Sequence, residues 1–378
     1  MDDRNGYMLK GKLARRGYDW WWHSLVGVSE KTGEKQPFFI EYYVINPALG
    51  GTEAMLGQLP ANKKKGIHPS YAMVKAGRWG SPDASGEKHM AQLHNFYPIS
   101  QFSADPDSMN VKIGKHTATE TRLVGSVRLS FEEALAHPEY MSDSGEMSWD
   151  LKAKKILPYS VGFGTSPFFR NINAFQMYWH AAGMLTEYEG RITFNGEEYR
   201  VEPETSAGYQ DKNWGCDYTS PWVWLNCNNF KSGITRNRLT RTSLDVGGAQ
   251  PVVFGVSLPR RLLVAFYHEG ELHEFNFSKF WTGSTQRFDC PVTDEKVEWN
   301  IDAWTRKAKI EIRFSCPRST MLNVNYENPD GDKRHNALWN GGFASGYVKL
   351  SRKTASGWEE IDTFDGELGG CEYGEYDR

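Results

Sequence analysis

Apolar and polar residues alternate through most of this sequence, and the alternation constrains the fold more than any other feature. The segment "PFFIEYYVI", residues 37–45, shows it clearly. Asn46-Pro47 and the glycines at 50–51 then end the run, as turn residues do. A period of two places successive side chains on opposite faces of a strand, so this segment is expected to be a β-strand.

The same pattern recurs along the chain. Only 131–140, "FEEALAHPEY", has a helical pattern, and it is short. Many strands of modest length separated by turns predict an all-β protein, a barrel or a sandwich, with few short helices. The Asn195-Gly196 pair predicts a tight hairpin turn. Strands next to it are expected at 174–186, 190–194 and 197–202.

The length of the chain allows more than one core. At 378 residues, two domains or two sub-barrels are expected. The sequence changes character at 145–160, "GEMSWDLKAKKILPYS". We therefore expect an N-terminal β unit over residues 1–150 and a C-terminal β unit over residues 151–378, which completes the ligand pocket.

Charge and motifs exclude several classes of function. The net charge of −3 is not the positive charge that is typical of nucleic-acid-binding proteins, so no nucleic-acid partner is expected. The first residues lack the apolar segment of a signal peptide, which favours a cytoplasmic location. The five cysteines lack the spacing of a zinc site, and no nucleotide- or nicotinamide-binding motif occurs, so neither a metal nor a cofactor is expected. An enzyme of this kind would use acid–base chemistry in an apolar pocket.

Aromatic residues are unusually abundant, at 14% of the chain, although the mean hydropathy is −0.61. They are densest in "QDKNWGCDYTSPWVWLNCNNF", residues 210–230. Alternation places Trp222, Trp224, Asn226 and Asn228 on one face of a strand. A ligand cavity accommodates indoles and amides together, whereas a dry core disfavours unpaired amides. Amides that bond to neighbouring loops are the alternative.

Three other segments carry candidate polar groups. In "GYDWWWHSLVG" one face holds Asp19, Trp21 and His23, which predicts either a proton-donating site or a histidine bonded within the structure. In "FQMYWHAAGM" Tyr178 and His180 share a face.

Glu41 lies between apolar residues of its strand. Desolvation would raise the pKa of such a carboxyl and keep it protonated. A structural ion pair with an arginine explains it equally well.

These segments together resemble the tocopherol cyclase family, within the lipocalin-like group that includes carotenoid 1,2-hydratases. The opening "GYDWWWHSL" is similar to the first strand of the family, with Asp19 at a Glu position and Trp20 at a Gly position. "IEYYVINPA" is similar to the second strand, and "GGCEYGEY" to the C-terminal segment, with Glu372 at a Glu position. The strongest match is "QDKNWG" followed by "SPWVWLNCNNF", where the matching residues are Asp211, Lys212, Asn213, Trp214, Gly215, Trp222, Trp224, Cys227, Asn228 and Phe230.

The resemblance implies two lipocalin-like antiparallel β-barrel units packed side by side, with a ligand pocket inside one of them. It also implies a cofactor-independent cyclase or hydratase that acts on an apolar substrate such as a prenylated phenol or an isoprenoid. In such an enzyme an acid protonates a prenyl double bond, a phenolic oxygen captures the cation, and aromatic faces shield it. Access of an apolar or amphipathic substrate would involve a peripheral membrane contact.

Two functions other than an enzyme also fit the sequence. The alternatives are a lipid or pigment carrier that uses the same barrel, and a carbohydrate-binding sandwich with exposed tryptophan platforms. Asp211 is the leading acid, although it would be an ion pair with Lys212 in the alternative interpretation. The expected catalytic groups are Asp211, Asp19, Glu41, Glu372 and His23; the expected substrate-binding residues are Trp21, Tyr178, His180, Trp214, Trp222, Trp224, Asn226 and Asn228.

Overall fold

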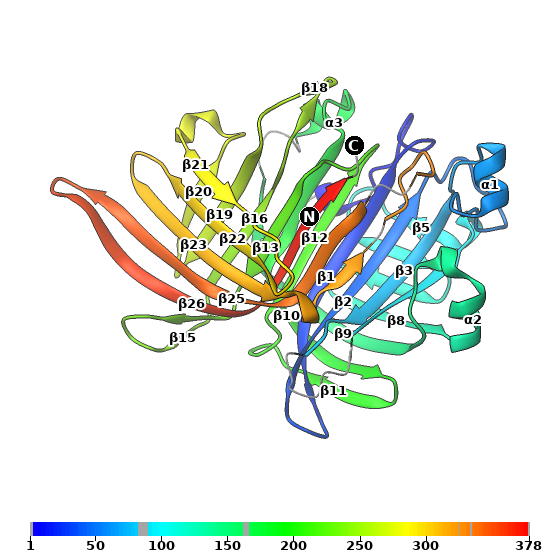
Figure 1. Cartoon of the computed structure of the whole chain (residues 1–378), viewed down its shortest axis with the longest axis horizontal. Helices are drawn as coiled ribbons and strands as arrows, with labels where there is room; N and C mark the ends of the chain where they lie inside the picture. The colour runs from blue at the N-terminus through cyan, green and yellow to red at the C-terminus, as the bar shows by residue number, and fades with distance from the viewer. Residues whose placement is uncertain (1–2, 82–89, 162–165, 325, 333–334, 377–378) are drawn as a thin grey trace.

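The computed structural model of the chain describes residues 3–81, 90–161, 166–324, 326–332 and 335–376. Nearly all of the regular structure in these residues is antiparallel β-sheet, so the all-β prediction is confirmed (Figure 1). The α-helices of the described residues are α1 (Pro60–Lys65), α2 (Phe131–Ala136) and α3 (Pro167–Asn171). None of them combines the length and the apolar character that a membrane span requires.

Helix α2 lies within the expected helical segment. Ser130 and Glu133 form a reciprocal capping box at its start. This local sequence signal explains why the helix could be predicted. The two other helices were not predicted. Each is only five or six residues long and begins with a proline, so neither carries a helical period.

The first sheet has twelve strands within the described residues, in the order β4-β3-β2-β1-β11-β10-β9-β8-β7-β6-β5, with β12 paired to β1 and β10. It is the blue, cyan and green half of Figure 1. Its strands are β1 (Tyr18–Ser29), β2 (Lys35–Ile45), β3 (Tyr71–Arg78), β4 (Ala91–Tyr97), β5 (Phe102–Ala104), β6 (Asn110–Ile113), β7 (His116–Thr119), β8 (Arg122–Leu129), β9 (Gly145–Tyr159), β10 (Met177–Phe194), β11 (Glu197–Val201) and β12 (Gly208–Gly215).

The second sheet also has twelve strands within the described residues and contains the path β20-β19-β16-β13-β26-β25-β23-β22-β21. A separate hairpin of β17 and β18 lies beside it. These strands are β13 (Trp222–Cys227), β14 (Phe230–Ser232), β15 (Arg238–Leu239), β16 (Thr242–Ala249), β17 (Val252–Val253), β18 (Val256–Ser257), β19 (Arg261–His268), β20 (Glu271–Asn276), β21 (Thr285–Asp289), β22 (Lys296–Trp304), β23 (Ala308–Pro317), β24 (Leu322–Val324), β25 (His335–Thr354) and β26 (Gly357–Tyr376).

The chain passes from the first sheet to the second at residues 216–221, whereas the sequence suggested a boundary at residue 150. That position falls inside β9, which pairs with both β8 and β10. Every second residue over much of β9 is exposed, so the segment looks polar in the sequence. A strand with one face exposed to solvent therefore produced the polar stretch that the sequence analysis interpreted as a boundary between units.

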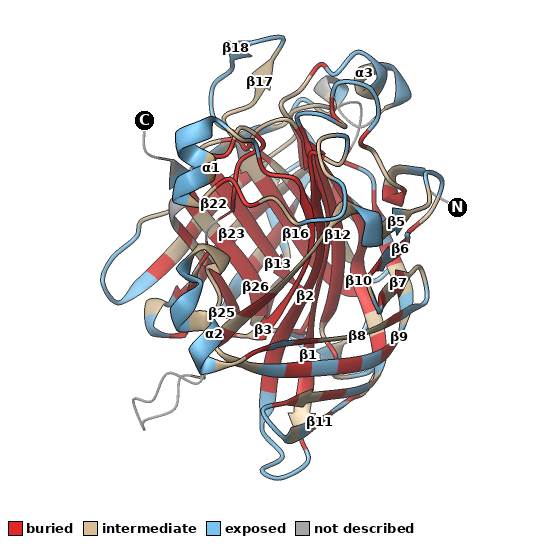
Figure 2. Ribbon diagram, turned by 90° about the vertical axis from the view of Figure 1, so that its right-hand side faces the viewer, coloured by how far each residue is buried: buried red, intermediate tan, exposed pale blue. Residues whose placement is uncertain are grey.

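Buried residues, red in Figure 2, form three apolar clusters. One fills the interior of the first sheet and includes Trp21 and Trp214. Another fills the interior of the second sheet and includes Leu225 and Cys371. The third combines residues of both sheets, among them Trp22 and Trp224, and is rich in aromatic rings. Both faces of the central strands are therefore buried, one inside a unit and the other between the units.

Candidate active site

A small buried cavity lies between the two sheets and is called the acid cavity here. Its volume is about 10 Å³, the size of one water molecule. Strands β1 and β12 line it from the first sheet and β13 and β26 from the second, because alternation turns every second residue of each strand toward the other sheet. The lining residues are Trp20, Trp22, Asp211, Asn213, Trp222, Trp224, Tyr326 and Glu372.

Asp211 is a buried acid with one oxygen bonded and the other open. Its Oδ2 accepts hydrogen bonds from Nε1 of Trp179 at 2.7 Å and from the hydroxyl of Tyr209 at 3.2 Å. Its Oδ1 has no hydrogen-bond partner among the described residues. Burial raises the pKa of Asp211 to about 8, against the opposing effect of the two donors. The carboxyl is therefore protonated at neutral pH and can act as a proton donor.

Tyr209 connects Asp211 to a second buried acid, Asp245 on β16. The Tyr209 hydroxyl lies 3.3 and 3.4 Å from the two carboxyl oxygens of Asp245 and accepts a hydrogen bond from Nε1 of Trp224. One hydroxyl hydrogen cannot serve two carboxylates, so at least one of the acids must donate to the hydroxyl oxygen. Burial, and then the charge of Asp211, raise the pKa of Asp245 well above its usual value. The hydrogen-bond geometry and the direction of the pKa agree.

Glu372 lines the opposite side of the acid cavity. Nε1 of Trp222 donates to its Oε2 at 2.6 Å, and the Asn340 amide donates to its Oε1. Burial raises the pKa of Glu372 to about 7 despite these two donors. Both of its oxygens are already bonded, so it has less freedom than Asp211 to donate a proton to a ligand.

Glu41 belongs to a buried ion pair beside Tyr326, which lines the acid cavity. Its Oε2 lies 3.2 Å from Nζ of Lys75 and accepts a hydrogen bond from Tyr326 at 3.2 Å. The Lys75 ammonium also lies 4.3 Å from the ring centroid of Tyr326. Burial raises the pKa of Glu41, while Lys75 opposes that shift. The ion-pair interpretation of Glu41 is thus the one that the structure supports, with a lysine in place of the expected arginine.

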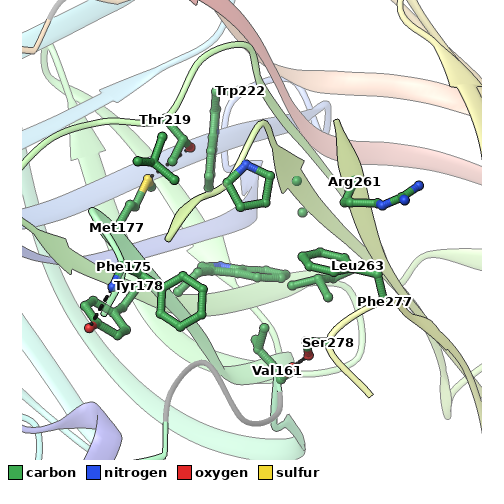
Figure 3. Close-up of a pocket in the computed structure, with 15 residues that line it drawn as sticks. Val161, Phe175, Met177, Tyr178, Thr219, Trp222, Arg261, Leu263, Phe277 and Ser278 are labelled. Carbon is green, nitrogen blue, oxygen red and sulfur yellow. Dashed lines mark hydrogen bonds between the residues drawn. The ribbon is translucent and has the colours of Figure 1, made fainter. Parts of the chain in front are cut away.

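An apolar cleft adjoins the acid cavity and has a volume of about 140 Å³ (Figure 3). Trp222 lines both the cleft and the acid cavity. Trp179 lines the cleft with its ring and holds Asp211 with its Nε1. The cleft therefore leads from the surface to the wall behind which Asp211 lies. Other residues that line it are Val161, Phe175, Met177, Tyr178, Leu263 and Phe277.

A family model described as tocopherol cyclase-like matches residues 22–374. The chain belongs to this family. Over 133 residues it is 29% identical to the "Probable tocopherol cyclase, chloroplastic" of Oryza sativa subsp. japonica, covering 34% of this chain and 23% of the rice protein. Over 158 residues it is 27% identical to the "Tocopherol cyclase, chloroplastic" of Zea mays, covering 41% of this chain and 27% of the maize protein. The matches thus span only a minor part of either plant protein.

Two solved structures are similar over most of their length. A Nitrosomonas europaea protein assigned as an AttH has a TM-score of 0.48 at 14% identity, covering 96% of this chain and 93% of that one. The kievitone hydratase of Nectria haematococca has a TM-score of 0.44 at 11% identity, covering 97% and 93%. At these values neither structure informs the function proposed below.

The residues expected to form one site in this tocopherol cyclase-like chain divide between two places. Asp211, Trp222, Trp224 and Glu372 line the acid cavity, and Tyr178 lines the cleft. The others lie elsewhere. Asp19 forms a buried ion pair with Lys212 inside the first unit, where the Lys212 ammonium lies 3.8 Å from the ring centroid of Trp21 and 5.6 Å from that of Trp214.

The two histidines also lie inside the first unit. Nδ1 of His23 is 2.8 Å from the hydroxyl of Tyr188, and burial keeps the pKa of His23 well below its usual value, so it is neutral. His180 is buried opposite Lys212 in the β10–β12 register. Neither histidine lines the acid cavity or the cleft.

The amides of β13 and the turn after it bond to backbone carbonyls. Asn226 donates to the carbonyls of Met184 and Leu244, and Asn228 donates to the carbonyl of Gly208 at 2.8 Å. They bond within and between the sheets rather than line the acid cavity. The alternative interpretation expected such bonds to neighbouring loops, whereas the acceptors belong to strands β10, β12 and β16.

Sequence reasoning missed Trp20, Trp22, Trp179, Tyr209 and Asp245. Tyr209 is two residues before Asp211, so alternation alone places both on one face. Asp245 in "TSLDVGGA" is flanked by Leu244 and Val246, which pack inside the second unit. An acid on the other face of such a strand was a detectable signal. The resemblance also implied a pocket inside one unit, whereas the acid cavity lies between the two.

The acids of the site do not form a metal-binding group. Among the described residues, no three His, Cys, Asp or Glu side chains are grouped so that they could hold a metal ion. What the acid cavity offers instead is two carboxyl groups of raised pKa beside aromatic rings.

Proposed function

We propose that this protein is a cyclase or hydratase that protonates a carbon–carbon double bond of an apolar substrate, with Asp211 as the proton donor. The observation that carries the proposal is a buried carboxyl in a cavity lined by tryptophans, with one oxygen open; burial raises the pKa of this carboxyl to about 8. Membership of the tocopherol cyclase-like family supports the same class of reaction.

The reaction proceeds in two steps, protonation of the alkene and capture of the resulting cation. Asp211 transfers its proton to one alkene carbon, which leaves a carbocation on the other carbon and a carboxylate on Asp211. A hydroxyl oxygen of the substrate, or of water, then forms a bond to the cation, and its proton returns to Asp211. General acid catalysis of this kind contributes about 10²–10⁴-fold in rate. Because the proton is recovered, the cycle consumes no co-reactant.

The tryptophans beside Asp211 suit the intermediate cation. Trp20, Trp22, Trp222 and Trp224 all line the acid cavity. A cation over an indole face gains about 2 kcal/mol or more when water is excluded. Trp22 and Trp224 meet edge to face, with ring centroids 6.4 Å apart, so they approach the cavity from different directions.

The apolar cleft supplies the place for the rest of the substrate. The acid cavity has room for about one water molecule, so the reacting group reaches Asp211 only when its wall shifts. Trp222 forms that wall, since it lines both spaces. A prenylated phenol or a similar isoprenoid fits this arrangement, with its chain in the cleft and its reactive end at Asp211.

The experiment that tests the proposal uses a prenylated hydroquinone in deuterated water, with the product analysed by mass spectrometry. We expect a ring-closed or hydrated product that carries one non-exchangeable deuterium, since the donated proton ends on carbon. Asp211→Asn should lower the rate by at least about 10²-fold.

Asp365→Asn is the matched control, because Asp365 is an exposed acid of β26 that approaches Arg236 at 3.7 Å. Turnover by the Asp211→Asn variant at the wild-type rate, with its fold intact, would remove Asp211 from the mechanism. Recovery of the substrate unchanged but bound to both proteins would favour the carrier function instead.

A further inference from the structure

Exposed apolar side chains are concentrated around the mouth of the apolar cleft. Thirteen large hydrophobic residues are exposed among the described residues, and six of them fall in three short segments. These segments are 166–175 with α3, 250–261 with the β17–β18 hairpin, and 278–284. We call the six residues the rim: Phe168, Ile172, Phe254, Val256, Leu258 and Trp281.

The three segments border one opening. Phe175, Val252 and Ser278 each come from a different segment, and all three line the cleft. The backbone N–H of Phe254 donates to the carbonyl of Ala174, and Phe175 pairs with Val253, so the hairpin is fixed beside the segment that follows α3. Figure 1 shows β18 and α3 at the same end of the molecule.

The charge around this opening has one sign within the segments. They contain four basic residues, Arg170, Arg260, Arg261 and Lys279, and no acidic residue. Arg170 pairs with Asp3 and Lys279 with Glu274, both from neighbouring segments. Arg260 is 3.8 Å from Glu375 and remains exposed, and Arg261 is exposed while it lines the cleft. Arg260 lines a separate hollow with Asp289 and Tyr373, so the positive charge at the mouth of the cleft comes from Arg261.

We propose that the rim inserts into the surface of a lipid bilayer that contains anionic headgroups, with Arg261 on those headgroups and the cleft open to the acyl chains. Apolar side chains in such a contact are buried in the interfacial region of the bilayer, and basic residues add electrostatic attraction. The cleft then takes its apolar ligand directly from the lipid phase.

A bilayer fits this surface better than a protein partner or a second copy of the chain. The rim consists of side chains that project separately from three segments, and a fluid surface accommodates such an outline without a matching shape. A docked protein would also cover the mouth of the cleft, which the rim surrounds. A lipid surface instead leaves the mouth in contact with the phase where apolar molecules dissolve.

The test measures sedimentation of the full chain with vesicles of phosphatidylcholine, alone or mixed with phosphatidylglycerol. We expect binding to the mixed vesicles that weakens as salt is raised, because screening reduces the headgroup attraction. The double variant Phe254→Ser/Val256→Ser should bind at least about tenfold more weakly, since two apolar side chains are lost from the contact. Arg261→Gln should reduce the preference for the mixed vesicles.

Phe131→Ser/Leu135→Ser is the matched control, because these residues of α2 are 67% and 73% exposed and lie outside the rim segments. It should bind vesicles like the wild type, and circular dichroism checks that each variant is folded. The proposal would be overturned if Phe254→Ser/Val256→Ser and Phe131→Ser/Leu135→Ser lost vesicle binding equally. It would also be overturned if the wild type bound no vesicles. A concentration-dependent dimer that the rim variant abolishes would overturn it as well, since the rim would then bind a second copy. No outcome depends on turnover, so the result is separate from the proposed reaction.

Discussion

Asp211 and Lys212 are neighbours in sequence but face opposite sides of β12. Asp211 lines the acid cavity between the sheets, whereas Lys212 pairs with Asp19 inside the first unit. An ion pair between the two neighbours, the alternative explanation of Asp211, is therefore not formed. The carboxyl keeps its proton because burial raises its pKa to about 8, and Lys212, paired with Asp19, does not oppose that shift.

The first prediction concerns the pH dependence of stability. The pKa of Asp211 is about 8 in the folded protein and lies near its usual value of 3.8 when unfolded. Between these values the folded state binds the extra proton, so the free energy of unfolding falls as the pH rises, by about 1.4 kcal/mol per pH unit from this group. The effect is absent below about pH 4 and complete above about pH 8.

Asp211→Asn should remove that contribution and become more stable than the wild type as the pH increases toward 8. Urea unfolding at a series of pH values measures it. Some slope should remain in the variant, because burial also raises the pKa of Glu372 to about 7. Parallel curves for the two proteins would show that Asp211 is already ionised in the fold.

The buried pair of Lys212 and Asp19 gives a second prediction. Both side chains are fully buried, so removing one partner leaves an uncompensated charge and should cost about 3–5 kcal/mol of stability. Lys212→Met should show this loss in urea unfolding. The double variant Asp19→Asn/Lys212→Met should recover much of it, because no buried charge then remains and an amide oxygen can still accept from the backbone N–H of Met8.

Activity separates this pair from the acid cavity. Turnover measured at a temperature where the double variant is folded should stay close to that of the wild type. Loss of turnover in a stable double variant would place Lys212 or Asp19 in the reaction.

A third prediction concerns Tyr209. Its hydroxyl donates to Asp211 and thereby favours the ionised carboxyl, so it lowers the pKa of Asp211. Activity that needs the protonated acid should decline as the pH rises through about 8. Tyr209→Phe should move this decline to higher pH, as pH–rate profiles of kcat/KM would show. Tyr347→Phe, at an exposed position, should leave it unchanged. A shift to lower pH in Tyr209→Phe would contradict the assigned hydrogen bond.

Alternation in the sequence predicted which residues share a face but not which face borders the site. Asp19, Trp21 and His23 do share one face of β1, as predicted, and Trp20 and Trp22 share the other. Nearly every residue of β1 is buried, because the strand has a core on each side. Burial by itself could not distinguish the two faces. That distinction depends on how the second sheet packs on the first, which a local pattern does not contain.

The acids show the same difference between what a local pattern predicts and what depends on the packing of the sheets. Asp211 and Glu372 both line the acid cavity, and both came from segments that also resemble the family. Asp245 is linked to Asp211 through the hydroxyl of Tyr209, from a strand of the other sheet. A contact between residues so far apart in sequence depends on the packing of the sheets, so no spacing rule could predict it.

The last prediction uses Gly247 to test the wall between the cleft and Asp211. A Cβ atom at this position would lie 2.7 Å from a ring carbon of Trp179. Gly247→Ala should therefore displace the indole, which lines the cleft and donates to Asp211. Displacements of about 1 Å can reduce rates about 10²-fold, so kcat/KM should fall strongly. Overpacking should also lower stability by about 1–3 kcal/mol.

Gly51→Ala is the control, because nothing lies within 4 Å of its added Cβ. Asp211→Asn in the Gly247→Ala background distinguishes a local effect from general damage. If the displaced indole acts through Asp211, the double variant should be no slower than Asp211→Asn alone, since interacting changes are not additive. Full additivity of the two losses would show that Gly247 affects the reaction by another route, such as binding of the substrate in the cleft.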